Sequence, residues 1–508
     1  MVSGITQQLT SKMADTRVED RSLSGLRSLA ETLDYTEKSW IETKETLDKL
    51  KTWALVQENR CFVTEANIVQ VKDVIVACKN TLRAQTREWK EQQLILCLKA
   101  LTEAFRFLRN CCAETPKNQN SIISSGVLEH VMDITVILLK PDFQESEQGS
   151  DVIDAIRSSL QLLGNTIVQN DTTQQFVWKK CFPRFFLNVF SSTNHRVQDC
   201  LCMIIYNCLN EHRRLQLVSD HDGLKIISHI VHLCSNKSQL EWGYLILDYL
   251  ICNGLFPEMY QGIEFDPVAR IILLDLLQVK ITAALDEPNN KSIEGQSEDD
   301  FYATSLGYLA EQFESHAVNI TQRLQQLDHS SDDFFQVLIV TRLLGILSVS
   351  TGLQSNLAGL QERTSLLVTC VDLLKETAKP EAKATFTNVS QLPQGVDSEE
   401  LSPSHGFQRD LVRVIGNMCY RHAANQNKVR ELEGIPLLLD HCNVDDQNPY
   451  ICQWAIFAIR NLLENNKENQ NIVSSMDPGG LANSSRLRQF GVEAVELDNG
   501  RIKLVQIT

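Results

Sequence analysis

Short apolar helices alternate with polar loops along the chain, and five of these helices end on the same pattern. Each has apolar residues two and three positions before an asparagine, and a glutamine nine positions after it. The asparagines are Asn110, Asn165, Asn207, Asn417 and Asn461, and the glutamines are Gln119, Gln174, Gln216, Gln426 and Gln470. Such self-similarity predicts one repeated unit that stacks on its neighbours, because a single unit cannot bury its apolar face alone.

The spacing of the asparagines indicates the length of the unit. Consecutive ones lie 55, 42, 210 and 44 residues apart, which fits a period near 42 if 141–151 is a polar insertion and the long gap holds five periods. Repeats of the armadillo and HEAT classes have about this length. We therefore predict an all-α protein, an armadillo/HEAT-like right-handed α-solenoid of about nine to eleven units.

The pattern changes along the chain and suggests a division into segments. They are N-terminal helices at 1–90, armadillo-like repeats at 91–285, an acidic loop at 286–300, degenerate helical repeats at 301–376, a flexible linker at 377–408, regular repeats at 409–473 and a tail at 474–508. The linker has three prolines and few large apolar residues, which argues against packing. In the tail, two short alternating runs flank Asp498-Asn499-Gly500, a tight-turn signal, so we expect a small hairpin there.

Charge and composition exclude some kinds of partner. Lys and Arg number 48 against 64 Asp and Glu, so the formal net charge is −16, which suits neither nucleic acid nor an anionic membrane. No apolar stretch reaches the roughly 18 residues that a membrane-spanning helix needs. The start of the chain does not resemble a signal peptide, and fifteen cysteines without a Cys-x-x-Cys pair are typical of buried, reduced thiols. We expect an intracellular protein with no nucleic-acid partner and no membrane insertion.

Signatures of catalysis are missing from the sequence. It has no Gly-x-Ser-x-Gly elbow, no Walker loop and no His-Glu-x-x-His motif. The histidines closest to a cluster, His212, His221, His229 and His232, lack further ligands at a metal-binding spacing. We predict a protein without catalytic residues, metal or cofactor, and keep a regulatory subunit of an enzyme complex as an alternative.

The repeated asparagine allows two interpretations. In armadillo proteins that bind extended peptides, an asparagine at this place lies in the concave groove and bonds the peptide backbone, so the five would form a ladder of partner-binding residues. Alternatively, each asparagine bonds backbone groups at its own helix end. The second interpretation is favoured because nuclear-transport adaptors carry a tryptophan four positions earlier. Here those positions hold Arg106, Gln161, Met203, Arg413 and Phe457.

Arginines on the same helices are a second candidate for partner binding. Arg106, Arg109, Arg413 and Arg460 either pair with acidic neighbours along a solvated face or form a groove for an acidic partner segment. We include Arg413 and Arg460 with the five asparagines as predicted groove residues. Trp454 and Phe457 are expected in the core, with a partner anchor as the alternative. Ser402, which precedes Pro403 in the linker, is a predicted phosphosite.

One region resembles a known family. The motifs at 409–420, 425–430, 434–439 and 454–462 are similar to the C-terminal conserved region of the ataxin-10 family. The resemblance implies a non-enzymatic, cytoplasmic or perinuclear scaffold with roles in neuron survival, neurite outgrowth signalling and cytokinesis. It also implies the O-GlcNAc transferase and a G-protein β subunit as partners. A peptide-binding transport adaptor and a homo-oligomer stay open as alternatives.

Overall fold

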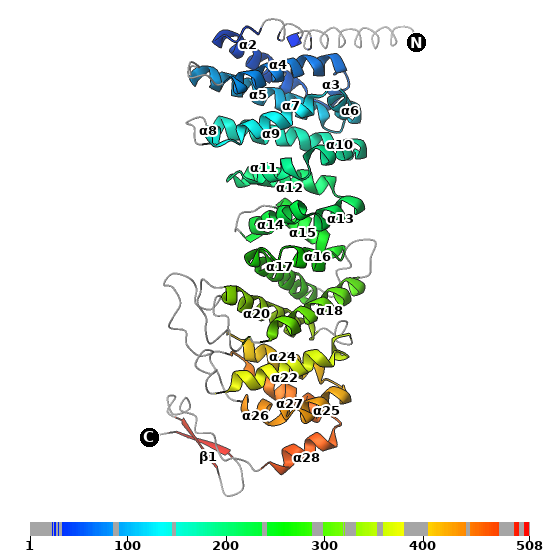
Figure 1. The fold of residues 1–508 in the computed structure, drawn as a ribbon, viewed down its shortest axis with the longest axis vertical. Helices are drawn as coiled ribbons and strands as arrows, with labels where there is room; N and C mark the ends of the chain where they lie inside the picture. Colours follow the sequence, from blue (N-terminus) through cyan, green and yellow to red (C-terminus); the bar gives the residue numbers. More distant parts are fainter. Residues whose placement is uncertain are drawn as a thin grey trace, which may run out of the picture. The chain divides into compact units, whose positions relative to one another are not determined.

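The computed structural model of the chain consists of α-helices and one two-stranded hairpin (Figure 1). It describes residues 23, 25–26, 29, 33–84, 91–144, 149–235, 241–286, 298–318, 320, 332–352, 359–379, 405–442, 448–476, 492–496 and 502–506. Most of the predicted acidic loop lies outside the described residues, as do 380–404 of the predicted linker, with Ser402. The chain divides into two compact units, Met1–Leu276 with Gln296–Phe301 (unit 1) and Leu277–Gly295 with Tyr302–Thr508 (unit 2).

Unit 1 repeats a group of helices, in most cases three, and the helix that ends each group is called its last helix. The bounds are α2 Glu37–Trp53, α3 Gln57–Arg60, α4 Glu65–Arg83, α5 Glu91–Cys112, α6 Pro116–Ser124, α7 Val127–Leu138, α8 Pro141–Gln144, α9 Gly149–Ile167, α10 Asp171–Cys181, α11 Arg184–Phe190, α12 His195–Cys208, α13 Glu211–Ser219, α14 His221–Ser235, α15 Glu241–Cys252, α16 Phe256–Gly262 and α17 Pro267–Asp286, which contains the boundary with unit 2. The last helices α2, α5, α9, α12 and α15 pack on one another in chain order (Figure 1).

Unit 2 follows the same scheme. Its helices are most of α18 Glu298–Ala317, then α20 Asp332–Ser350, α22 Thr364–Ala378, α24 Phe407–Met418, α25 Ala423–Glu431, α26 Gly434–Asp440, α27 Ile451–Leu463 and α28 Lys467–Ser475. The last helices α20, α24 and α27 pack in series. In the tail, β1 Val492–Glu496 pairs antiparallel with β2 Ile502–Gln506, over the residues where a hairpin is expected. The predicted armadillo-like α-solenoid is confirmed.

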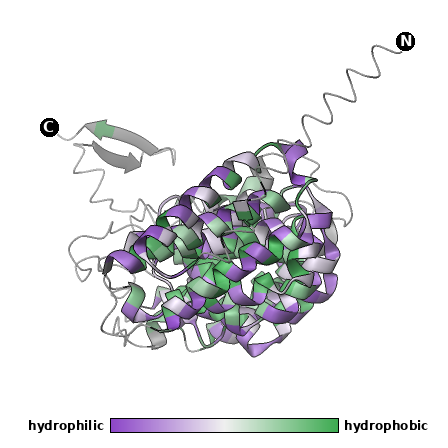
Figure 2. Ribbon diagram, turned by 90° about the horizontal axis from the view of Figure 1, so that it is seen from above, coloured by the Kyte–Doolittle hydropathy of each residue, from purple (hydrophilic) through white to green (hydrophobic). Residues whose placement is uncertain are grey.

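The core of each unit forms where the three helices of successive repeats meet. Figure 2 shows hydrophobic residues gathered among the packed helices and hydrophilic ones around them. All fifteen cysteines are free, and most of them are buried. Burial raises the pKa of Cys112 and Cys208 to about 12, which keeps these thiols protonated.

Loop asparagines start many of the helices. The side chains of Asn170, Asn210 and Asn466 accept the backbone N–H three residues ahead, and so satisfy a donor that the helix itself cannot pair. Within the described residues, no single helix is long and apolar enough to cross a membrane. The helices α6 and α7 pass that test only as a pair, bent by 73° at their junction.

The break before α26 differs from the sequence expectation. A positive φ is expected at Gly434, but the left-handed residue is Glu433, with φ 53°. Gly434 is required for another reason: a Cβ there would lie 2.6 Å from Val429 Cγ1 and 3.2 Å from the Val429 carbonyl oxygen. The position therefore excludes side chains by close approach and not by backbone conformation.

Substitution of Gly434 by valine tests this explanation. We expect Gly434→Val to lower the free energy of unfolding of unit 2 by about 1–2 kcal/mol, because the added atoms overlap Val429. Glu433→Gly should stabilise unit 2 slightly or leave it unchanged, because glycine adopts positive φ without strain. Chemical denaturation of both variants measures the difference, and an unaltered midpoint for Gly434→Val would refute the overlap.

Candidate partner-binding face on the last helices

Each repeated asparagine lies at the end of a last helix, and most of them bond the last helix before it. Asn165 Nδ2 donates to the Arg109 carbonyl at 3.1 Å, and Asn461 Nδ2 donates to the Gly416 carbonyl at 2.9 Å. Both acceptors lie one position before the asparagine of the preceding repeat. The other bonds run from Asn110 to the Lys51 carbonyl (3.1 Å), from Asn417 to the Thr351 hydroxyl (3.0 Å) and from Asn207 to the Met203 carbonyl of its own helix (2.8 Å).

These bonds give the asparagines a role in stacking the repeats. Only Asn207 follows the expected pattern of bonding its own helix end; the other four amides connect successive last helices. Carbonyls in the last turn of a helix lack an intrahelical partner, and the amides of Asn110, Asn165 and Asn461 supply one. A peptide-binding role for the asparagines stays a prediction.

Two of the repeated glutamines, Gln119 and Gln426, bond the following repeat, whereas Gln174 and Gln470 bond their own. Gln119 Nε2 donates to the Asn165 carbonyl at 3.0 Å, and Gln426 Nε2 donates to the Asn461 carbonyl at 2.9 Å. Gln119 and Gln426 are both buried. Where both bonds form, as at Asn165 with Gln119 and at Asn461 with Gln426, the repeated amides connect successive repeats.

These bonding patterns reveal two repeats that the sequence pattern misses. Asn253 ends α15 and donates from Nδ2 to the Tyr249 carbonyl at 2.7 Å, as Asn207 does to Met203. Gln361 Nε2 donates to carbonyls at and just beyond the end of α24, those of Met418 at 3.2 Å and Tyr420 at 2.9 Å, as a repeated glutamine does. The residue nine positions before Gln361 is Gly352, which therefore stands at the asparagine position of this repeat. Five periods of 42 would put four asparagine positions between 207 and 417. The described residues show two such positions, at 253 and 352, and the count of five periods stays a prediction.

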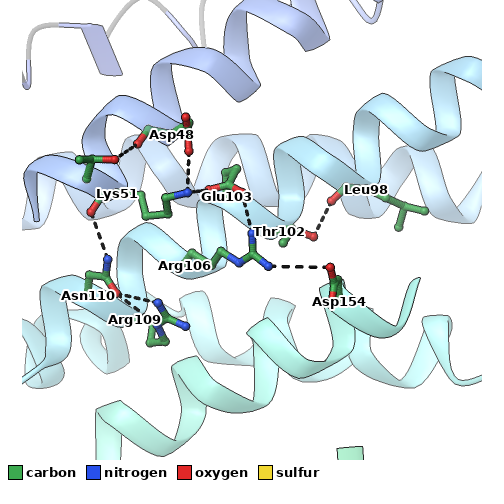
Figure 3. A network of polar contacts seen from close by, with 10 residues as sticks. Asp48, Lys51, Leu98, Thr102, Glu103, Arg106, Arg109, Asn110 and Asp154 are labelled. Atoms are coloured by element: carbon green, nitrogen blue, oxygen red, sulfur yellow. Dashed lines mark hydrogen bonds and ion pairs between the residues drawn. The ribbon is translucent and has the colours of Figure 1, made fainter. Parts of the chain in front are cut away.

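Ion pairs occupy the last helices at the start of unit 1 (Figure 3). Lys51 of α2 lies 2.7 Å from Glu103 of α5, which also pairs with Arg106 at 2.9 Å. Arg106 reaches Asp154 of α9 at 3.9 Å. On the next turn, Arg109 donates to Gln161 of α9 at 2.6 Å. Arg106 and Arg109 are thus engaged within the fold, as the solvated-face interpretation expects.

Arg413 in unit 2 has a different environment. Its guanidinium stacks over the ring of Trp454 on α27, 4.6 Å from the ring centroid, and its Nε is buried without a hydrogen-bond partner. The nearest carboxylate, on Asp410, already takes two hydrogen bonds from Arg409, at 2.8 and 3.0 Å. Burial lowers the pKa of Arg413, which shows that its charge is partly removed from water.

Side chains around Arg413 complete an amphipathic patch. A Cβ built on Gly352 would lie 3.8 Å from both Arg413 Nη2 and Asn417 Nδ2, so these two polar groups lie together at the end of α20. On α27, the Trp454 and Phe457 rings pack edge to face with centroids 5.7 Å apart. Both side chains were expected in the core, but the structure leaves them half-buried.

Arg460 extends this patch toward the end of the chain. It is exposed and takes the repeat position of Arg109, which bonds Gln161 on the following last helix. The described residues contain no last helix after α27, and Arg460 has no ion pair there. We name Arg413, Asn417, Trp454, Phe457 and Arg460 the Arg413 patch.

Comparison with known proteins identifies the family. Residues 407–505 match a family model described as the spinocerebellar ataxia type 10 protein domain. This range runs from the start of α24 to the last but one residue of β2 and contains the whole Arg413 patch. Ataxin-10 of Bos taurus is 31% identical over 459 residues, which cover 89% of this chain and 92% of the relative. The chain belongs to the ataxin-10 family.

Other ataxin-10 proteins match to the same degree. That of Xenopus tropicalis is 33% identical over 80% of both chains, and that of Homo sapiens is 31% identical over 89% of this chain and 92% of its own length. Among solved structures, SYS-1 has a TM-score of 0.35 at 12% identity, with 87% of this chain and 75% of that chain covered. The assignment of the α-solenoid rests on the helix packing within this chain.

Within the described residues, no three or more His, Cys, Asp or Glu side chains lie together in a way that could hold a metal ion. The contacts on the last helices are hydrogen bonds, ion pairs and aromatic stacking.

Proposed function

We propose that this member of the ataxin-10 family is a non-enzymatic protein-interaction scaffold, and that the Arg413 patch binds an acidic segment of a partner. The observation that supports this most directly is the Arg413 guanidinium, which is stacked on Trp454 and partly buried, and whose Nε has no hydrogen-bond partner among the described residues. Arg460 adds a second unpaired cation, and the Asn417 side chain adds an amide.

A carboxylate is the group that best satisfies this arrangement. A guanidinium presents two parallel N–H groups that match the two oxygens of a carboxylate, and stacking on an aromatic ring holds its plane in place before the ligand arrives. Burial without a counter-ion makes the pairing more favourable than at an exposed arginine, because part of the desolvation cost is already present in the free protein. Trp454 and Phe457 supply apolar area beside the cation, which is typical of binding hot spots.

The cellular role is proposed from the family. We propose that the scaffold acts in the cytoplasm, including the perinuclear region, in neurite outgrowth, neuron survival and cytokinesis, with the O-GlcNAc transferase and a G-protein β subunit as candidate partners. The net charge of −16 supports protein partners over nucleic acid.

Binding of an acidic peptide to the full chain tests the Arg413 patch. The probe is a fluorescein-labelled nonapeptide of alternating Glu and Ser, measured by fluorescence anisotropy. We expect Arg413→Gln to weaken binding about tenfold, as for the loss of a charge-assisted hydrogen-bond pair. Arg413→Lys should also weaken it, because an ammonium lacks the planar fork.

Lys467→Gln is the matched control. Lys467 is exposed on α28 outside the patch, so removing its charge should change the affinity by less than about twofold. If Arg413→Gln binds the peptide as tightly as the unaltered chain, the proposed site is wrong.

A further inference from the structure

An aromatic surface lies on the last helices α12 and α15 of unit 1. The ring centroid of Tyr206 is 5.7 Å from that of Trp242 and 6.5 Å from that of Tyr249, with interplanar angles of 55° and 79°. All three side chains are half-buried, and Leu245 beside them is 41% exposed. We call these four residues the Trp242 surface. The ion pairs that occupy α2, α5 and α9 are replaced here by rings.

Two carboxylates adjoin this surface without a cation. Asp199 lies two turns before Tyr206 on α12 and accepts the backbone N–H of Trp242, while its Oδ1 is buried without a hydrogen-bond partner. Burial raises the pKa of Asp199, and the negative charge of Glu241 raises it further. No ion pair involves Asp199 or Glu241 among the described residues.

The same chain shows what an aromatic side chain in this fold can bind. In unit 2 the ring of Trp454 is covered by the guanidinium of Arg413, and in unit 1 that of Tyr260 is covered by Arg270, 4.1 Å from the ring centroid. Among the described residues, no cation lies over Trp242, Tyr206 or Tyr249.

We propose that the Trp242 surface binds a cationic side chain, a lysine or arginine of a partner segment, with Asp199 and Glu241 as the adjacent anions. Aromatic faces attract an ammonium or guanidinium through their quadrupole, and the attraction increases where water is excluded. An anionic ligand would be repelled by the two carboxylates, and an apolar ligand would bury them further without compensation. The inference is independent of the Arg413 patch, which lies in the other unit and has the opposite charge.

Fluorine NMR of the full chain labelled with 5-fluorotryptophan tests the cation site directly. Tetramethylammonium chloride is the probe, and sodium chloride at equal ionic strength is the reference. We expect the Trp242 resonance, assigned with Trp242→Phe, to shift and saturate. The Trp454 resonance should not do so, because Arg413 already covers that ring. A shift that does not saturate, or that is equal at both residues, would overturn the proposal.

A peptide experiment measures the same site by affinity. A fluorescein-labelled nonapeptide of alternating Lys and Ser should bind the full chain, and Trp242→Leu should weaken it about tenfold. Asp199→Asn should weaken it about three- to fivefold, and this variant keeps all three rings, so it decides the question even if Trp242→Leu fails to fold.

The control for these variants is Leu215→Ala, which removes an exposed apolar side chain of α13 outside the surface and should leave the affinity unchanged. Unchanged binding of the lysine peptide by Asp199→Asn would contradict the inference. The Arg413→Gln variant should lose binding of the glutamate peptide and keep binding of the lysine peptide. That result would show that the Trp242 surface and the Arg413 patch are separate binding sites.

Discussion

Gln426→Leu should lower the free energy of unfolding of unit 2 by about 3 kcal/mol, because each buried polar group left without a partner costs about 1–3 kcal/mol. Gln426 is buried, and its Nε2 donates to the carbonyls of Cys419, Asn461 and Glu464. Its Oε1 also accepts from Asn466 Nδ2 at 3.2 Å. Leucine has nearly the same volume but can replace none of these bonds. Denaturant unfolding followed at 5-fluorotryptophan 454 reports on this unit.

Gln470 provides the control at the same repeat position. It is exposed and bonds only its own repeat, at the Leu463 carbonyl. Gln470→Leu should therefore change the free energy of unfolding by no more than about 0.5 kcal/mol. Equal destabilisation by both variants would mean that bonding between repeats is not what makes the glutamine important.

Gly416→Ala should destabilise unit 2 by about 2 kcal/mol, although alanine is the better helix former. A Cβ at Gly416 would lie 2.9 Å from the Ala458 Cβ and 3.0 Å from the Ala458 Cα, so α24 and α27 would have to move apart. That movement would also stretch the bond from Asn461 to the Gly416 carbonyl. The unfolding midpoint of unit 2 and the hydrogen exchange of α27 both measure the effect.

Gly307→Ala is the matched substitution with the opposite sign. Gly307 lies inside α18, and a Cβ there meets nothing within 4 Å. Alanine should stabilise the helix by about 0.5–1 kcal/mol through its propensity alone. If both variants were stabilising, the close approach of α24 and α27 at Gly416 would be disproved.

The repeated Asn and Gln side chains were visible in the sequence because the same need for hydrogen-bond donors recurs from one repeat to the next. Every last helix ends with carbonyls that need donors, and Asn and Gln side chains can reach them from fixed positions. The pattern is lost where a glycine stands at one of these positions, as Gly352 does at the asparagine position and Gly262 does at the glutamine position after Asn253. The sequence pattern therefore did not reveal these two repeats, and the count of five periods between Asn207 and Asn417 stays a prediction.

The candidate sites were less accessible from sequence. Arg106 and Arg413 hold the same repeat position, yet Arg106 pairs with Glu103 and Asp154, whereas Arg413 stacks on Trp454 and forms no ion pair among the described residues. Asp154 and Trp454 each lie about one repeat further along the chain than the arginine that they contact. The clustering of Trp242 with Tyr206 and Tyr249 was not predicted from the sequence, because Tyr206 and Tyr249 come from different last helices and meet only when these helices pack.

Sequence alone was sufficient for the α-solenoid, its repeated amides and the family, because each depends on residue types that recur at regular intervals along the chain. It also set the overall negative charge. Packing between successive last helices determined which arginines are paired, which direction each asparagine bonds and where aromatic rings gather. These properties depend on contacts between residues roughly 40 to 60 positions apart, and a pattern read along one chain does not contain them.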